Sequence, residues 1–171
     1  GGVDSSVAAW LMQQAGYDCI GVTMKLYSGE AAPEAERSKT CCSLDDVEDA
    51  RSVAHRLGIP YYVFNFTGDF RREVMERFVC AYESGATPNP CIDCNRHLKF
   101  DRLYHRAQEL GCDRVVTGHY ARIERSGERY LLKKSAVPEK DQSYVLYALT
   151  QEQLAQRVGV SAQAVSKWEN N

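Results

Sequence analysis

The sequence lacks any long apolar run. No uninterrupted hydrophobic stretch approaches the roughly 18 residues that a helix needs to cross a bilayer, so we expect no membrane span. Internal repeats and low-complexity segments are absent as well. With 44% hydrophobic and 26% charged residues among 171, the composition is typical of one soluble globular domain.

The chain also lacks an overall positive charge. Its formal net charge is −2, which argues against nucleic-acid binding by total charge alone. However, residues 96–140 carry 11 Lys and Arg against 6 Asp and Glu. The basic stretch from Arg96 to Arg106 indicates either a face that follows phosphates or a solvated amphipathic helix.

The seven cysteines do not form the pattern of a secreted disulfide framework, because their number is odd and they are spread along the chain. The cysteine pattern fits reduced thiols and therefore a cytoplasmic location. The chain begins with Gly1 and Gly2 rather than Met. We interpret it as a fragment whose first strand lies upstream of Gly1.

Helix and strand patterns alternate. Helices are predicted to end at Gly16 and Gly58, and the polar stretch Ser28 to Lys39 is predicted to be a loop. The expected helices cover about 3–15, 43–57, 69–84 and 95–110; the expected strands cover 19–24, 61–66 and 114–117, with a β-hairpin over 120–134. This order predicts a Rossmann-like α/β fold, with helices on both faces of a parallel sheet.

A glycine-rich segment, G-G-V-D-S-S, leads directly into the first predicted helix. The glycines allow a close approach of backbone to ligand, and the hydroxyls of Ser5 and Ser6 lie beside the N–H groups of a helix N-terminus, which is an anion site. No Lys follows, so this is not the G-x-x-x-x-G-K-[ST] loop. The alternative is a simple helix cap by Asp4 or Ser5. The segment resembles the PP-loop of enzymes that split ATP between its α- and β-phosphates.

A second segment, T-P-N-P-C-I-D-C-N, places Cys94 at the start of a predicted helix that continues with Arg96, His97 and Lys99. A helix N-terminus and nearby cations favour thiolate, so Cys94 is a candidate nucleophile. The competing hypothesis is a metal site. Cys91 and Cys94 form half a zinc site that His97 and His105 would complete, or they join an iron–sulfur site with Cys41 or Cys42.

Two further polar segments follow the last predicted parallel strand. T-G-H-Y-A-R contains His119 at the strand's carboxyl end, where ligands bind in such sheets. E-K-D-Q-S-Y comes after the hairpin and contains Lys140, Asp141 and Gln142. Each is either a recognition loop or a purely structural feature.

In their order along residues 1–155, the motifs resemble the tRNA-specific 2-thiouridylases. They are G-G-V-D-S-S, G-V-T-M-K-L-Y, C-C-S-L-D-D-V-E-D-A-R, N-P-C-I-D-C-N-R, K-F, T-G-H-Y-A-R and K-D-Q-S-Y-V-L-Y. Other PP-loop enzymes share only the first motif. The resemblance implies a sulfurtransferase with a PP-loop fold.

The resemblance implies a reaction in two steps. ATP, with Mg²⁺, adenylates the C2 oxygen of the wobble uridine in tRNAs for Lys, Glu and Gln, and persulfide sulfur then replaces that oxygen. A persulfide relay protein is the implied sulfur donor. Cys94 would be the catalytic nucleophile, with no metal. The ATP phosphates would be held by Gly1, Gly2, Val3, Asp4 and Ser5, and the adenosine by Met24 and Gly118; the target base would contact Asn89, Pro90 and Cys91, and tRNA would contact His119, Lys140, Asp141 and Gln142.

This chain departs from the family pattern. The family's second catalytic cysteine, its central domain and its C-terminal β-barrel lie beyond the match, so the fragment is expected to be deficient in the full reaction. Some members carry Asp where this chain has Cys91.

The last residues, Leu149 to Asn171, resemble the helix-turn-helix of phage-repressor-like regulators. The expected helices are 151–158 and 162–169, with a turn at 159–161. We therefore divide the chain into a thiouridylase domain, 1–155, and a tail, 156–171, that is not an independent domain. A chimeric reading frame explains the tail most economically, so DNA is not an expected partner. The rival functions are a DNA-binding regulator and a metal-dependent PP-loop enzyme.

Overall fold

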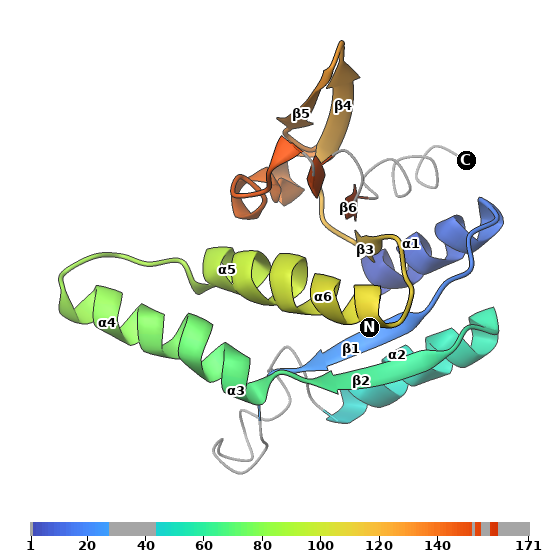
Figure 1. Cartoon of the computed structure of the whole chain (residues 1–171), viewed down its shortest axis with the longest axis horizontal. Helices are drawn as coiled ribbons and strands as arrows, with labels where there is room; N and C mark the ends of the chain where they lie inside the picture. The colour runs from blue at the N-terminus through green and yellow to red at the C-terminus, as the bar shows by residue number, and fades with distance from the viewer. Residues whose placement is uncertain (1, 28–43, 152, 155–157, 161–171) are drawn as a thin grey trace. The chain divides into compact units, whose positions relative to one another are not determined.

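The computed structural model describes residues 2–27, 44–151, 153–154 and 158–160 (Figure 1). The predicted loop at 28–39, Cys41, Cys42, Ser43 and the tail from 161 onward lie outside these residues. The chain divides into two compact units, Gly1–Arg71 and Arg72–Asn171. This division falls within the predicted domain 1–155.

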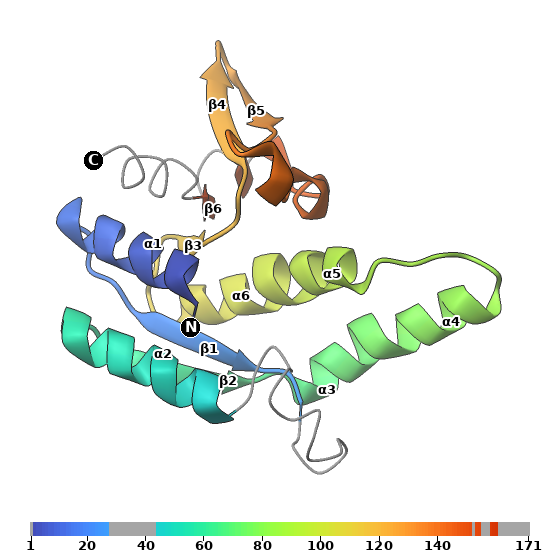
Figure 2. The ribbon, with the colours of Figure 1, turned by 180° about the vertical axis from the view of Figure 1, so that it is seen from behind.

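The first unit begins with helix α1 (Val3–Gln14), strand β1 (Gly21–Lys25), helix α2 (Leu44–Leu57), strand β2 (Tyr61–Asn65) and the short helix α3 (Thr67–Phe70). β1 and β2 pair in parallel, from Gly21 opposite Tyr61 to Lys25 opposite Asn65. α2 connects them and packs along the pair (Figure 2). The predicted helix ends are confirmed, since Gly16 and Gly58 have φ of 85° and 68°, a conformation that favours glycine.

Close packing in this unit depends on Gly21. A Cβ at this position would lie 3.3 Å from the Tyr61 ring and 3.5 Å from Ala54 Cβ of α2. Ala54 is itself buried, and Tyr27 packs edge-on against Phe70 with ring centroids 4.8 Å apart. Small residues therefore bring α2 against the strand that carries Met24.

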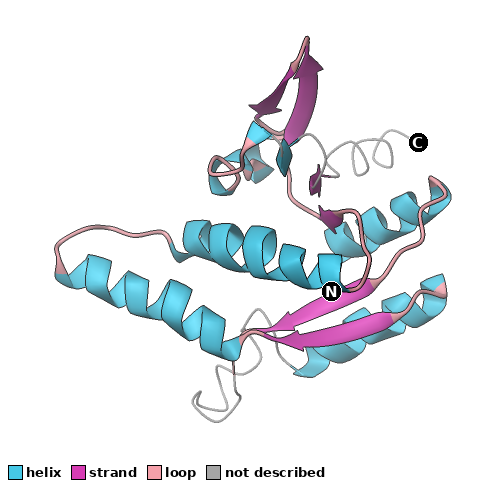
Figure 3. Cartoon of the chain, viewed as in Figure 1, coloured by secondary structure: helices cyan, strands magenta, loops and turns pink. Residues whose placement is uncertain are grey.

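Two long helical segments follow, and each is drawn as one continuous helix (Figure 3). The first continues from α3 through a π-helical stretch, η2 (Arg71–Glu76), into α4 (Arg77–Glu83). The second consists of α5 (Pro90–Asp93), the π-helical stretch η3 (Cys94–Arg102) and α6 (Leu103–Glu109). The first begins slightly before the predicted residue 69. The second begins at Pro90 and not at Asn95, which corrects the prediction.

Short strands follow. β3 (Val115–Thr117) pairs in parallel with β6 (Val158–Val160), whereas β4 (Arg122–Ser126) and β5 (Arg129–Lys133) form the predicted hairpin. Two 3₁₀ turns come after it, η4 (Pro138–Lys140) and η5 (Ser143–Val145). The core contains Phe100, Ala121, Val145 and Leu146. Parallel pairing with helical connections confirms the predicted α/β class.

The tail differs from its prediction. Gln151, Gln153 and Leu154 are helical, but Val158–Val160 is a strand where the end of a helix and a turn were expected. The reason is that its backbone pairs with β3. In the described ranges, no helix has both the length and the apolar character needed to span a membrane.

Candidate functional site

The start of α1 is open to solvent. Gly2 occupies the N-cap position with φ −71° and ψ 175°, and as a glycine it provides no side-chain cap. A Cβ on Gly2 would have no atom within 4 Å, and Val3 is 77% exposed. The N–H groups of a first helical turn have no intrahelical acceptor. This end of α1 therefore presents backbone donors beside open space, and anion binding here stays a prediction.

The two serines of the motif bond within the helix. Ser5 Oγ and Ser6 Oγ donate to the carbonyl oxygen of Gly2 at 3.1 and 2.9 Å. They can turn toward a ligand only by giving up these bonds. Gly1 lies outside the described residues. Met24 is half-buried on β1 in the same unit as this helix end, whereas Gly118 belongs to the second unit.

The start of α5 is capped by the chain itself. Asn89 is the N-cap, its Oδ1 accepts from the backbone N–H of Cys91 at 3.0 Å, and Pro90 occupies the first turn. Asn and Pro are the residue types preferred at these positions. They move the helix start upstream of Cys94, so Cys94 lies after the first turn and not at the N-terminus. Cys91 is exposed and Cys94 is half-buried.

Asn95 is a site residue that sequence analysis missed. It is 3% exposed, and its Nδ2 donates to the carbonyl oxygen of Cys91 at 2.8 Å. Its Oδ1 is buried and accepts no hydrogen bond from the described part of the chain. A buried acceptor without a donor costs about 1–3 kcal/mol. The signal was available, since Asn95 directly follows the candidate nucleophile and shares a helix face with the buried Leu98.

His119 lies in a buried polar cluster. His119 is 8% exposed. Its Nδ1 lies 2.8 Å from Thr117 Oγ1, and its Nε2 lies 3.5 Å from Lys99 Nζ. The Phe100 ring lies 6.0 Å from the imidazole, centroid to centroid. Burial, and then the charge of Lys99, lower the pKa of His119 from 6.5 to about 4. At neutral pH His119 is therefore uncharged.

The K-D-Q residues bond mainly to the chain. Asp141 accepts from Ser135 N–H at 2.6 Å and from Ser143 Oγ at 2.8 Å. These bonds, the first above all, hold its pKa below the usual value. Gln142 exchanges two hydrogen bonds with Tyr120, at 2.8 and 3.0 Å. Lys140 is exposed, with Nζ 5.2 Å from the Tyr120 ring centroid. The structure thus joins this segment to T-G-H-Y-A-R.

An ion pair connects the helix that carries Cys94 to α4, since Arg77 Nε lies 3.5 Å from Asp93 Oδ2. Within the Cys94 helix, His97 Nε2 lies 3.9 Å from Asp93 Oδ1. His105 Nε2 lies 3.3 Å from Asp101 Oδ1. Within the described ranges, no group of three or more His, Cys, Asp or Glu side chains is arranged to hold a metal ion.

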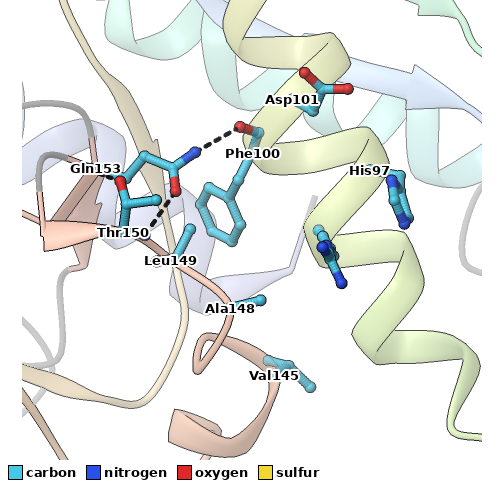
Figure 4. A pocket seen from close by; sticks show the side chains of 9 residues that line it. His97, Phe100, Asp101, Val145, Ala148, Leu149, Thr150 and Gln153 are labelled. Carbon is cyan, nitrogen blue, oxygen red and sulfur yellow. Dashed lines mark hydrogen bonds between the residues drawn. The ribbon is translucent and has the colours of Figure 1, made fainter.

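A cavity of about 260 Å³ lies beside this helix in the second unit (Figure 4). Phe100, Val145 and Leu149 supply its apolar lining. Gln153 supplies a polar part, and its amide donates to the Phe100 carbonyl at 3.4 Å and accepts from Thr150 N–H at 2.8 Å. The cavity also borders Arg96, the first residue of the basic stretch.

The second unit therefore groups most of the predicted site residues around two neighbouring features. One is the helix start with Asn89, Cys91 and Cys94, and the other is the cluster in which Lys99 of that same helix contacts His119. Together they offer two thiols one turn apart, a buried amide oxygen and a cation. In the first unit, the start of α1 is an exposed helix N-terminus.

Comparison with known proteins gives the family. The family model described as "tRNA methyl transferase HUP domain" matches residues 1–166. The chain is 58% identical over 156 residues to the tRNA-specific 2-thiouridylase MnmA of Clostridioides difficile, which covers 90% of this chain and 43% of that protein. The protein of the same name from Geobacter metallireducens is 54% identical over 158 residues, covering 91% and 43%. The chain thus spans less than half the length of these curated relatives. From the match over residues 1–166, the chain belongs to the tRNA methyl transferase HUP domain family.

Proposed function

We propose that this chain is the ATP-binding and catalytic part of a tRNA 2-thiouridylase that acts on the wobble uridine of tRNAs for Lys, Glu and Gln. The observation that carries the proposal is the 58% identity, over 90% of the chain, to a relative named for that activity. The fold and the two candidate regions are consistent with it. The proposed location is the cytoplasm, where tRNA and reduced thiols are found.

In the first step, the start of α1 binds the phosphates of ATP, which enters with Mg²⁺. The uracil O2 attacks the α-phosphorus, and pyrophosphate leaves. The support is the uncapped helix end, where Gly2 leaves room and the first turn leaves N–H donors. The proposed ATP-binding residues are Gly1, Gly2, Val3, Asp4 and Ser5 for phosphates, and Met24 and Gly118 for adenosine.

In the second step, Cys94 carries the chemistry. A sulfur-donor protein loads a persulfide on the family's second catalytic cysteine, which lies beyond the matched residues. The terminal sulfur of that persulfide attacks C2 of the activated uracil, and AMP leaves. The Cys94 thiolate then attacks the inner sulfur, which releases 2-thiouridine and leaves a disulfide between the two cysteines. The base would be held by Asn89, Pro90 and Cys91, and the tRNA by His119, Lys140, Asp141 and Gln142. A wobble base suits such a site because it is already single-stranded.

The test measures pyrophosphate release by the chain with ATP and an unmodified tRNA transcript. We expect release that requires the transcript and does not require a sulfur donor, because adenylation precedes sulfur transfer. A chain that binds ATP but releases no pyrophosphate with any of the three tRNAs, even after it is joined to the upstream strand and the downstream domains of its relatives, would contradict the proposal.

The roles of the two steps are separated by Cys94→Ser. In the chain joined to the downstream domains of its relatives, this variant should abolish 2-thiouridine formation in the presence of a persulfide donor and should leave pyrophosphate release unchanged, because a serine hydroxyl cannot attack the disulfide that holds the sulfur. The matched control is Cys80→Ser, which alters an exposed thiol on α4. Equal loss of both steps in Cys94→Ser would refute the assigned role.

A further inference from the structure

One quoted motif, K-F at Lys99 and Phe100, has no function in the mechanism above. Both of its residues contact His119. Lys99 Nζ lies 3.5 Å from His119 Nε2, and the Phe100 ring lies 6.0 Å from the imidazole. Phe100 is 4% exposed, whereas Lys99 is half-buried. The motif thus builds the surroundings of His119, and its ammonium is the more accessible polar group of the pair.

The two polar contacts of His119 favour one tautomer of its neutral imidazole. A lysine ammonium has three donors and no acceptor, so Nε2 must accept in the contact with Lys99. The ring proton then resides on Nδ1, which donates to Thr117 Oγ1 at 2.8 Å. An imidazolium would direct a second N–H at the ammonium, which both the like charges and the burial oppose. Burial and Lys99 accordingly lower the pKa of His119 to about 4.

We propose that Lys99 supplies the positive charge of this part of the site, and that His119 is a positioning residue whose neutral Nδ1–H imidazole holds the Lys99 ammonium. The anionic group that meets Lys99 is a phosphate, either of ATP or of tRNA. This assignment rests on the proposed function, and it transfers to Lys99 the direct contact expected of His119.

The first experiment needs no substrate. Long-range ¹H–¹⁵N spectra of the histidine side chains in the whole chain should assign the Nδ1–H tautomer to His119 at pH 7, with His119→Gln identifying its signals. Lys99→Met should shift the His119 nitrogens and raise its pKa, though not to 6.5, because burial remains. An Nε2–H tautomer, or an unchanged spectrum in Lys99→Met, would overturn the proposal.

The second experiment measures affinity for Mg·ATP and for an unmodified tRNA transcript separately, so that the source of the phosphate is identified. Lys99→Met should weaken one of the two at least tenfold, and Lys99→Arg should retain most of the affinity. His119→Gln should lose less than His119→Leu, since the Gln amide oxygen can still accept from Lys99. Lys133→Met, which removes a lysine paired with Glu124 at 2.6 Å on the hairpin, is the matched control.

The two proposals fail differently. A wild-type chain that binds neither Mg·ATP nor the transcript contradicts the proposed function. A wild-type chain that binds, combined with full binding by Lys99→Met, contradicts the role of Lys99 alone. A loss in His119→Leu without any loss in Lys99→Met would return the substrate contact to His119.

Discussion

The N-termini of α1 and α5 differ in their N-caps: the cap of α1 provides no side-chain hydrogen bond, whereas the cap of α5 does. α1 begins after a glycine that provides no side-chain cap, beside open space. α5 begins after Asn89, whose side chain accepts from the Cys91 N–H, and has Pro90 in its first turn. Replacing an N-cap Asn by Ala typically costs about 1 kcal/mol of stability. The first end has no side-chain acceptor at its N-cap, while the second uses one donor of its first turn to fix the position of two thiols.

The contrast extends to the polar residues around each end. The residues near Cys94 and His119 are bonded largely to one another, through Asn95, Thr117, Asp141 and Gln142. Substitutions in this second region should therefore affect folding first, whereas substitutions at the start of α1 should affect ligand binding first. The following four predictions challenge that distinction.

The largest effect is expected for Gly2→Asp. A carboxylate at this N-cap can accept from the first-turn N–H groups, so it competes with the phosphate and repels it. We expect ATP affinity to fall by about a thousandfold, or about 4 kcal/mol. The free energy of unfolding measured in urea should stay unchanged or rise slightly. Isothermal titration and urea unfolding measure the two quantities. Gly68→Asp, at another glycine with open space around its Cβ position, is the control.

The second prediction concerns the pH dependence of stability through His119. Its folded pKa of about 4 lies below the reference value of 6.5, so the unfolded state binds more protons between these values. This contribution is complete above about pH 6.5 and is lost as the pH falls toward 4. It amounts to roughly 3 kcal/mol at most. Urea unfolding from pH 7 to pH 4.5, followed by circular dichroism, should give a steeper decline for wild type than for His119→Asn. Parallel curves would contradict the neutral buried state.

The third prediction concerns Asp141. Asp141→Ala leaves the N–H of the buried Ser135 without its acceptor, and we expect a loss of about 2 kcal/mol in the free energy of unfolding. Because a carboxylate repels phosphate, the residue should assist tRNA binding only by holding the loop that contains Lys140. Asp141→Asn, which keeps an acceptor oxygen, should therefore retain both stability and tRNA affinity. Equal loss in the Asn and Ala variants would indicate that the charge itself is needed.

Sequence patterns predicted the fold class, the ends of α1 and α2 at Gly16 and Gly58, and the hairpin, because each has a local signal. They placed the start of the Cys94 helix too late, although Asn89 and Pro90 form a standard cap. The pairing of β3 with β6 was missed because the two strands lie far apart in the sequence. The local sequence of a strand does not indicate which distant strand it pairs with. The contacts of His119 with Lys99 and of Gln142 with Tyr120 likewise depend on tertiary packing.

The smallest effect is expected for Asn89→Ala, and it tests the contrast between the two helix starts directly. Removing the Oδ1 acceptor frees the Cys91 N–H and should cost about 1 kcal/mol of unfolding free energy, whereas Asn89→Asp and Asn89→Ser should cost less. Affinity for ATP should stay within twofold of wild type, because this cap does not lie at the start of α1. If Asn89→Ala weakened ATP binding as strongly as Gly2→Asp, the two ends would serve one ligand, and the assignment of phosphates to α1 and of sulfur chemistry to α5 would have to be abandoned.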